Sequence, residues 1–571
     1  MTFTIAWRLL LLISFTTSGC AQRTITQQQL ERMGLQPPAA RESLARADSY
    51  YDYLTAQYYV RASQIDQATV AYNKALEKDP HSVTLLTELA SLYVRQGKID
   101  SALKLVQEAT TFDPNYEQGH MMLGQLYAAS GQNGRAIASY KRAMEMNPAN
   151  GDVYLLLGTL YAQEGRFSEA METFEHLQRQ FPGNPMALYY RARVFMDMKS
   201  YDQAEAAYRE VLSIEATFEN ALLDLAYIYE VTNRTKAAEE TYLRILSFDA
   251  GSVQANTRLG NLYMREGKFD QALQQFGRLL HGNRKDPESR LKIGIIHLQQ
   301  KNYEDAIQDF TFLLKEEPQY DQALYYLATT YDEKGDSDQA IVNLRTISRN
   351  SPLWTAAQIR LALIFSKMKD YRSGQEALNE AIDKRPDLPE LYLYLGALYE
   401  DEKKYNEAMK VFDKGLEKAP RDVDLLFRKG ALLDKMGNKD EAIVVMRKVL
   451  VIEPKNANAL NYIGYSYAEL GTNLAEARQM IKTALEIEPE DGYIMDSMAW
   501  VYYRMGQYKK ALDTILEAIK RVPKDPVIHE HLGDIYVALG NKAKAAQAYQ
   551  RALEYEHTEP EKIHQKLREL Q

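Results

Sequence analysis

The sequence holds a single cysteine, Cys20, in 571 residues. No disulfide can therefore form within the chain. Basic residues are also outnumbered, because 69 Lys and Arg stand against 78 Asp and Glu, for a formal net charge of −9. Binding to phosphate groups needs a basic stripe, so this balance argues against nucleic acid as the main partner. No apolar run reaches the roughly 18 residues of a membrane-spanning helix.

Catalytic motifs are missing as well. The sequence has no Gly-Lys-Thr/Ser phosphate loop and no Gly-x-Ser-x-Gly nucleophile elbow. His529 and His531 are two residues apart, so on one helix they point to different sides and do not share a metal ion. Neighbouring carboxylates such as Asp332 and Glu333 lack a partner that would make one an acid and the other a base. We therefore expect no enzyme, no metal, no cofactor and no small-molecule substrate.

Residues 1–20 differ from everything that follows. Arg8 precedes a short apolar core at 9–13, and small residues lead to Cys20. This order predicts a secretory signal. Two alternatives stay open for the N-terminus: an ordinary secretory signal without lipid, and a misassigned start on a cytosolic protein.

Residues 18–20, Ser-Gly-Cys, resemble the end of a bacterial lipobox. The resemblance implies that Cys20 is lipidated and becomes the first residue of the mature chain. Ala21 follows the cysteine, and by resemblance to Gram-negative lipoproteins this favours the outer membrane, facing the periplasm. Residues 21–48 are polar and contain Pro37 and Pro38, which predicts a tether between the anchor and the rest of the chain.

From Ser49 onward the sequence repeats every 34 residues. Each unit has a small residue at position 8, an aromatic at 11, glycine at 15, alanine at 20, a large residue at 24 and proline at 32. Twelve units keep this step, and a thirteenth, from Ala457, takes one extra residue near 472–474. The pattern predicts fifteen two-helix units over 49–559 and a capping helix over 560–571.

Each repeated residue type has a physical reason. Small residues at positions 8 and 20 allow the first helix of a unit, helix A, to pack closely on the second, helix B. Large residues at 11 and 24 are expected to fill the space between units. Glycine at 15 tolerates the left-handed conformation that ends helix A.

The unit 151–184 shows these marks together and resembles the tetratricopeptide repeat family. Its marks are Gly158, Tyr161, Gly165, Ala170, Phe174 and Pro182. The resemblance covers about nine-tenths of the chain. It implies an all-α fold, a right-handed superhelical solenoid of about fifteen helix-turn-helix units, with proteins or peptides as ligands of its concave groove.

The C-terminal units also resemble long bacterial tetratricopeptide proteins. Together with the N-terminus, this favours a periplasm-facing, membrane-anchored lipoprotein that supports assembly of an envelope complex, such as exopolysaccharide export or pilus biogenesis. A cytosolic adaptor or regulator is the alternative. A carbohydrate-handling accessory that uses groove tyrosines is a third reading.

In this family, ligands meet helix A at positions 2, 5, 9, 12 and 13. Units nine to fifteen place eleven acids and three bases at those positions. Six of the acids lie at positions 12 and 13, near the C-terminus of helix A, where the helix dipole disfavours negative charge. These six are Asp332, Glu333, Glu400, Asp401, Asp434 and Glu469. Either they bind a basic ligand, or they form a solvated face.

A second candidate for the groove combines aromatic rings with one acid. It contains Tyr465, Asp496, Trp500 and Tyr503. A tryptophan that faces a groove is a typical interface anchor. The alternative is that the rings only pack against a neighbouring helix.

Overall fold

The computed structural model describes residues 39–282 and 286–570. These residues form α-helices joined by short turns, with no strand among them, so the all-α prediction is confirmed. The chain divides into two compact bodies, an N-terminal body, Met1–Leu262, and a C-terminal body, Tyr263–Gln571. Cys20, the predicted signal 1–20 and most of the predicted tether lie outside the described residues.

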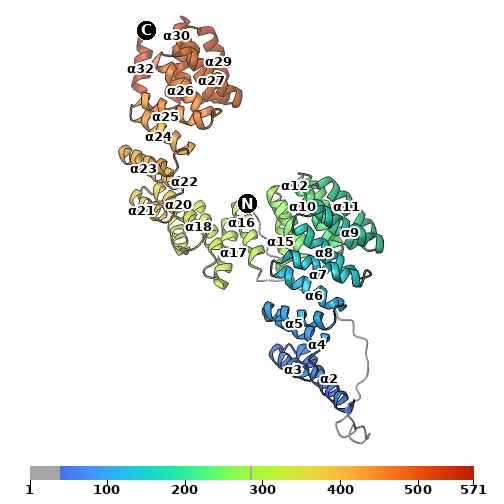
Figure 1. Cartoon of the computed structure of the whole chain (residues 1–571). Helices are drawn as coiled ribbons and strands as arrows, with labels where there is room; N and C mark the ends of the chain where they lie inside the picture. Colours follow the sequence, from blue (N-terminus) through green and yellow to red (C-terminus); the bar gives the residue numbers. More distant parts are fainter. Residues whose placement is uncertain (1–38, 283–285, 571) are drawn as a thin grey trace. The chain divides into compact units, whose positions relative to one another are not determined.

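The helices of the N-terminal body follow one another as antiparallel hairpins in chain order (Figure 1). They are α2 (Ala39–Arg61), α3 (Ile65–Lys78), α4 (Val83–Arg95), α5 (Ile99–Phe112), α6 (Glu117–Ala129), α7 (Asn133–Met146), α8 (Gly151–Gln163), α9 (Phe167–Gln180), α10 (Pro185–Asp197), α11 (Tyr201–Ile214), α12 (Glu219–Val231) and α13 (Thr235–Phe248). The next helix, α14 (Val253–Arg265), contains the boundary between the bodies.

The C-terminal body repeats the same arrangement. Its helices are α15 (Phe269–Gly282), α16 (Pro287–Gln299), α17 (Tyr303–Glu316), α18 (Asp321–Lys334), α19 (Ser337–Thr346), α20 (Trp354–Lys367), α21 (Tyr371–Lys384), α22 (Pro389–Asp401), α23 (Tyr405–Lys418), α24 (Val423–Lys435), α25 (Lys439–Ile452), α26 (Ala457–Leu470), α27 (Leu474–Ile487), α28 (Gly492–Arg504), α29 (Tyr508–Arg521), α30 (Pro526–Ala538), α31 (Lys542–Glu554) and α32 (Pro560–Glu569). Even-numbered helices up to α30 are the A helices and odd-numbered helices are the B helices.

The first helix is longer than the repeat pattern predicts. It begins at Ala39, ten residues before Ser49, where the first unit was expected to start. Ser49 itself is buried, and its hydroxyl donates a hydrogen bond to the Ala75 carbonyl at 3.0 Å. The last helix, α32, begins at Pro560, one repeat after the start of α30 at Pro526, so it stands where helix A of another unit would begin.

Position 15 has the left-handed conformation that the sequence predicts. Gly335, which ends α18, has a φ of 93°. The same backbone persists where the glycine is missing, as at Lys369, whose φ is 60°. The other non-glycine residues at this position are Ser63, Lys199, Asn233, Lys301 and Lys403, all with positive φ. The turn geometry is therefore set by the hairpin as a whole, at a local cost where a side chain is present.

Position 8 is small because the large residue at position 24 lies directly on it. A Cβ atom added to Gly294 would stand 2.6 Å from a ring carbon of Phe310, in the partner helix of the same unit. Phe310 also stacks on Tyr326 of the next unit, with ring centroids 6.1 Å apart. Residue 24 therefore packs within its own unit as well as between units, where the sequence analysis expected only the second contact.

Candidate functional site

The predicted groove acids are not isolated charges in the C-terminal body. An oxygen of Asp332, near the end of α18, lies 3.0 Å from Nζ of Lys367 in α20, and its other oxygen lies 3.6 Å from Arg360. The Asp332 side chain is only 8% exposed. Glu400 of α22 stands in the same relation to Lys435 of α24, at 4.0 Å. In both pairs an acid at position 12 meets a lysine at position 13 of the next unit.

Glu400 is the least well satisfied of these acids. Burial raises its pKa, while the positive charges of Arg428 and Lys435 act in the opposite direction. One of its carboxylate oxygens, Oε1, is buried and has no hydrogen-bond partner in the described part of the chain. Glu400 therefore lies at the edge of the interior and not in an open acidic field.

The remaining predicted acids differ in how much charge they present. Asp434 lies 3.9 Å from Lys439, which also forms an ion pair with Glu469. Asp401 accepts a hydrogen bond from the Ser366 hydroxyl at 3.0 Å, and its residue is exposed. Glu333 is exposed too.

The count of eleven acids and three bases, made from the sequence, left out basic side chains that lie close to the acids in the structure. Arg360, Arg428 and Lys439 stand at positions that the count did not include, yet they face the acids. Binding of a basic ligand by the six acids stays a prediction, with Glu333 and Asp401 as its most accessible members.

The aromatic candidates form one stack across neighbouring A helices. The Trp500 ring stacks on Tyr503, with centroids 4.7 Å apart, and on His531, with centroids 4.2 Å apart. Both pairs are close to parallel, at 13° and 18°. Tyr465 of α26 lies 6.2 Å from the same histidine. Trp500 is therefore already packed against one ring of its own helix and one ring of the next A helix.

Asp496, another predicted ligand contact, is used inside the protein. His531 Nδ1 donates to its two oxygens at 2.9 and 3.0 Å, and both residues are buried. Burial disfavours the charged imidazole, but the charge of Asp496 and this hydrogen bond raise the pKa of His531 overall. Sequence reasoning considered His531 only as a metal ligand. The sequence signal for this pair was the spacing between Asp496 and His531, which is one repeat plus one residue.

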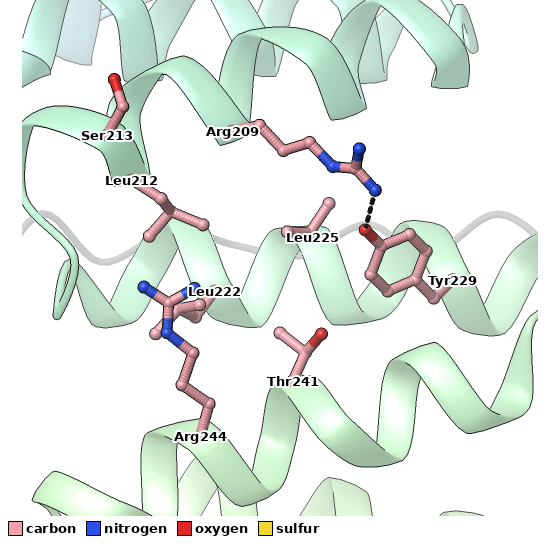
Figure 2. A pocket seen from close by; sticks show the side chains of 8 residues that line it. All are labelled: Arg209, Leu212, Ser213, Leu222, Leu225, Tyr229, Thr241 and Arg244. Carbon is pink, nitrogen blue, oxygen red and sulfur yellow. Dashed lines mark hydrogen bonds between the residues drawn. The ribbon is translucent and has the colours of Figure 1, made fainter.

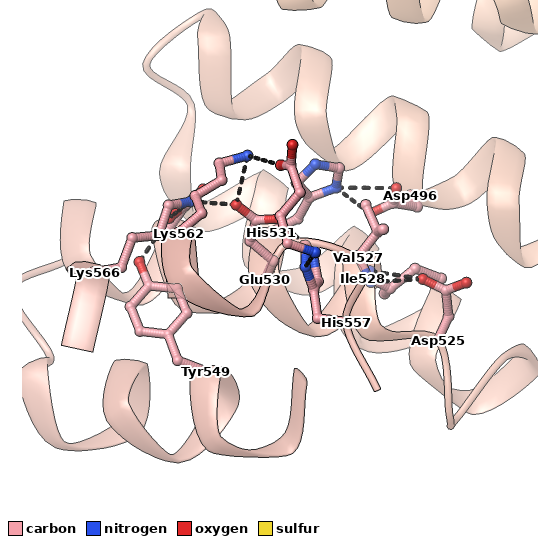
Figure 3. Close-up of polar contacts among 12 residues, drawn as sticks. Asp496, Asp525, Val527, Ile528, Glu530, His531, Tyr549, His557, Lys562 and Lys566 are labelled. Carbon is pink, nitrogen blue, oxygen red and sulfur yellow. Dashed lines mark hydrogen bonds and ion pairs between the residues drawn. The ribbon is translucent and has the colours of Figure 1, made fainter. Parts of the chain in front are cut away.

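A second polar cluster joins α30 to the last helix, as Figure 3 shows. Lys566 of α32 donates to Glu530 at 2.7 Å and to Asp534 at 2.6 Å, and Lys562 lies 3.1 Å from Glu530. His557 Nε2 donates to Glu530 at 2.9 Å, since its Nδ1 already accepts from the Glu559 amide. Although burial opposes the charged form, Lys566 and Lys562 lower the pKa of Glu530 to about 2.

Four buried polar atoms of α26, α28 and α30 have no hydrogen-bond partner among the described residues: the Tyr462 hydroxyl, Nδ1 of His529, the Trp500 indole nitrogen and the Asn461 side-chain oxygen. The Trp500 nitrogen is a donor on α28, and the Asn461 oxygen is an acceptor on α26. These two helices pack against each other. An unpaired buried polar group costs about 1–3 kcal/mol, so each one calls for an explanation. Asn461 was not singled out from the sequence, although it occupies position 5, one of the ligand positions that the resemblance implies.

The described residues offer neither a metal site nor a membrane-spanning helix. Across 39–282 and 286–570, no group of three or more His, Cys, Asp or Glu side chains is placed to hold a metal ion. Within those limits, no helix combines the length and the apolar character needed to cross a bilayer.

The tetratricopeptide repeat pattern matches along both bodies. One description of this repeat matches residues 59–126, 127–194, 195–254 and 297–364, and three others match 257–311 and 497–557, 389–432, and 423–456. The chain belongs to the tetratricopeptide repeat family. Repeats of this family generally mediate binding between proteins and are typically non-catalytic.

Several tetratricopeptide repeat proteins resemble parts of the chain. TPR repeat-containing protein PA4667 of Pseudomonas aeruginosa is 40% identical over 79 residues, 14% of this chain and 13% of that protein. Human tetratricopeptide repeat protein 7A is 29% identical over 104 residues, 18% of this chain and 12% of that protein. The chain thus spans about an eighth of the length of these relatives.

Solved structures are similar at low identity. A tetratricopeptide repeat protein from Parabacteroides merdae is 19% identical, with 44% of this chain and 98% of that chain covered and a TM-score of 0.36. The structure of MamA protein is 23% identical, with 30% of this chain and 96% of that chain covered and a TM-score of 0.28.

Proposed function

We propose that this protein is a non-catalytic, protein-binding scaffold held at the outer membrane by acyl chains on Cys20. It faces the periplasm and supports assembly of an envelope complex, such as exopolysaccharide export or pilus biogenesis. The family supports the binding role, and the lipobox-like residues 18–20 support the anchor. Each buried methylene of an acyl chain contributes roughly 0.8 kcal/mol, so two or more chains hold a protein stably at a bilayer.

The observation that carries the binding site is that α28 and α26, which pack against each other, each hold a buried polar atom without a partner among the described residues, the donor of Trp500 and the acceptor of Asn461. A peptide group has one N–H and one C=O, so the main chain of a partner segment that inserts between these helices would offer an acceptor to Trp500 and a donor to Asn461. The stack of Tyr503, Trp500 and His531 supplies a rigid apolar wall beside them.

Charge adds a second preference in the partner. The exposed Glu333 and Asp401 favour a basic or amphipathic segment, because carboxylates of one sign along a surface raise the local concentration of a cationic ligand. This attraction weakens with salt, since the Debye length is about 8 Å at physiological ionic strength.

Trp500→Phe tests the site, because phenylalanine keeps an aromatic ring in the stack and removes the N–H donor together with the second ring of the indole. Cross-linking of whole cells, followed by purification and quantitative mass spectrometry, compares the partners of wild type and variant. We expect partner recovery to fall about fivefold to tenfold, the effect of one lost hydrogen bond of about 1–1.4 kcal/mol. Trp354→Phe is the matched control, because Trp354 is a buried ring of α20. Equal recovery with wild type and both variants would refute this site.

Labelling with a clickable fatty acid tests the anchor separately. Wild type should take the label and fractionate with the outer membrane, and Cys20→Ser should lose the label and become soluble. A wild-type protein that retains Met1, takes no label and stays soluble would overturn the localisation and favour the cytosolic adaptor. The binding site at Trp500 would stand or fall independently of that result.

A further inference from the structure

A cavity of about 330 Å³ opens between two consecutive B helices of the N-terminal body, α11 and α13, over the A helix α12 (Figure 2). Its floor is apolar and consists of Leu212, Leu222 and Leu225, all buried. Arg209 of α11 and Arg244 of α13 reach over this floor from two sides. The volume lies within the range of about 300–1,000 Å³ that small-ligand sites occupy.

The two arginines are held in different ways. Arg209 lies 2.7 Å from Glu205 and donates to the Tyr229 hydroxyl at 3.2 Å, which fixes its direction. Arg244 donates one hydrogen bond, to the Ala216 carbonyl at 2.5 Å, and its remaining N–H groups have no partner among the described residues. Arg244 is exposed, so its guanidinium is available to a ligand.

The surroundings of the cavity carry excess positive charge. Arg234 also pairs with Glu205, at 2.7 Å, so Arg209 and Arg234 share one carboxylate, while Arg244 has no acidic partner among the described residues. Burial opposes the charge of Glu205, yet hydrogen bonds from Arg234 and Tyr229 keep its pKa below the usual value, so it stays ionised. The cluster of Arg209, Arg234, Arg244 and Glu205 is therefore net positive.

A second cavity lies at the equivalent place of the repeat. The packing of the helices therefore forms the cavity, and the lining residues determine its chemistry. It has about 390 Å³ and lies between the B helices α23 and α25 of the C-terminal body. Its lining residues Asp413, Lys429, Leu433 and Val445 are each 204 residues, six repeats of 34, after Arg209, Leu225, Tyr229 and Thr241. There the arginine is replaced by an aspartate, which pairs with Lys429.

We propose that the arginine-rimmed cavity of α11, α12 and α13 binds an acidic peptide segment of a second partner protein. A leucine-like side chain of that segment lies on the leucine floor, and neighbouring carboxylates accept hydrogen bonds from Arg244 and Arg209. A guanidinium can donate two parallel hydrogen bonds to one carboxylate, so arginine is favoured over lysine for this contact. This surface goes beyond the groove proposed above and has the opposite charge preference. The protein would thus hold an acidic and a basic partner on separate surfaces.

Fluorescence anisotropy tests the proposal with the full-length protein and a labelled peptide that alternates glutamate and leucine. We expect saturable binding that weakens as salt rises. Arg244→Glu should lower the affinity at least about tenfold, because it places a like charge against the ligand. Arg142→Glu is the matched control, since Arg142 occupies the same repeat position 102 residues earlier, is exposed and pairs with Glu145. This control should stay within about twofold of wild type.

A peptide with glutamine in place of glutamate separates charge recognition from apolar adhesion. We expect it to bind at least about tenfold more weakly than the acidic peptide, even to unaltered protein. This comparison keeps the test valid should Arg244→Glu disturb the turn at Ala216, which its circular dichroism melt would reveal. The proposal is overturned if the acidic peptide fails to bind wild type at millimolar concentration, or if both peptides bind it equally. It is also overturned if a folded Arg244→Glu binds as wild type does.

Discussion

Asp496 of α28 and His531 of α30 form a buried pair with 2.9 Å between carboxylate and imidazole, across two consecutive repeats. The two residues are separated by 35 positions, one more than the repeat. The same separation joins Asp332 to Lys367. Residues 35 positions apart are therefore neighbours on consecutive A helices. Charged side chains at these positions form pairs between units within the protein itself.

Asp496→Asn should weaken the C-terminal repeats more at pH 5.5 than at pH 8.5. The pKa of His531 is raised in the folded protein, by Asp496 first and also by Asp534 and Glu530, against the effect of burial. The stabilisation is therefore complete below the unfolded value near 6.5 and is lost as pH rises through the folded pKa. We expect a loss of roughly 1.5–3 kcal/mol at the lower pH.

Urea unfolding followed by the fluorescence of Trp500, which stacks on His531, measures this loss. A Trp354→Phe background removes the other described tryptophan signal. Asp401→Asn serves as the control, because Asp401 is exposed and bonded only to a hydroxyl. An equal loss at both pH values would show that Asp496 acts through packing alone.

Lys566→Met should release α32 from α30 while keeping the length of the side chain. Glu530 and Asp534 would lose their nearest cationic side chain. Because the pKa of Glu530 is lowered to about 2, its contribution is present above the unfolded value of 4.5 and disappears as pH falls toward 2. That difference corresponds to roughly 3 kcal/mol. Hydrogen-exchange protection in 560–569 should fall for the variant at pH 7, and for wild type only as pH approaches 2.

Gly294→Ala should destabilise the eighth unit, although alanine favours a helix by about 1 kcal/mol over glycine. The new methyl group would meet Phe310 at 2.6 Å, and overpacking of this kind costs roughly 1–3 kcal/mol. Adding Phe310→Leu should restore part of the loss. Gly277→Ala in α15 is the control that should stabilise, because nothing lies within 4 Å of the added atom. Thermal unfolding of the four proteins decides between crowding and propensity.

Lys369→Gly should stabilise the C-terminal body by roughly 1 kcal/mol. Lys369 has a φ of 60°, where an L side chain costs about 1–2 kcal/mol and glycine does not. Lys414→Gly, in the middle of α23, should instead cost about 1 kcal/mol. Urea midpoints that move in the same direction for both variants would contradict this assignment of strain to position 15.

The sequence by itself determined the helical hairpins and their turns. The 34-residue period places the residue with left-handed backbone conformation at position 15 and small residues at position 8. Both features are required by the geometry of a single hairpin. Even the extra residue of the thirteenth unit was visible. It falls at the turn where Gly471 and Asn473 both have positive φ. Such features depend on residues within about 20 positions of one another, so a linear pattern carries them.

Only the tertiary structure decided which of the candidate site residues are available to a ligand. Counting acids on helix A predicted an open negative field, but Asp332 and Glu400 lie beside lysines of the following unit. Trp500 matched an interface anchor, yet its ring stacks on Tyr503 and His531, and its buried N–H has no acceptor in the described part of the chain. The reason is physical: charge and aromatic character belong to single residues, whereas screening and burial depend on distances between units that the stacking of helices creates.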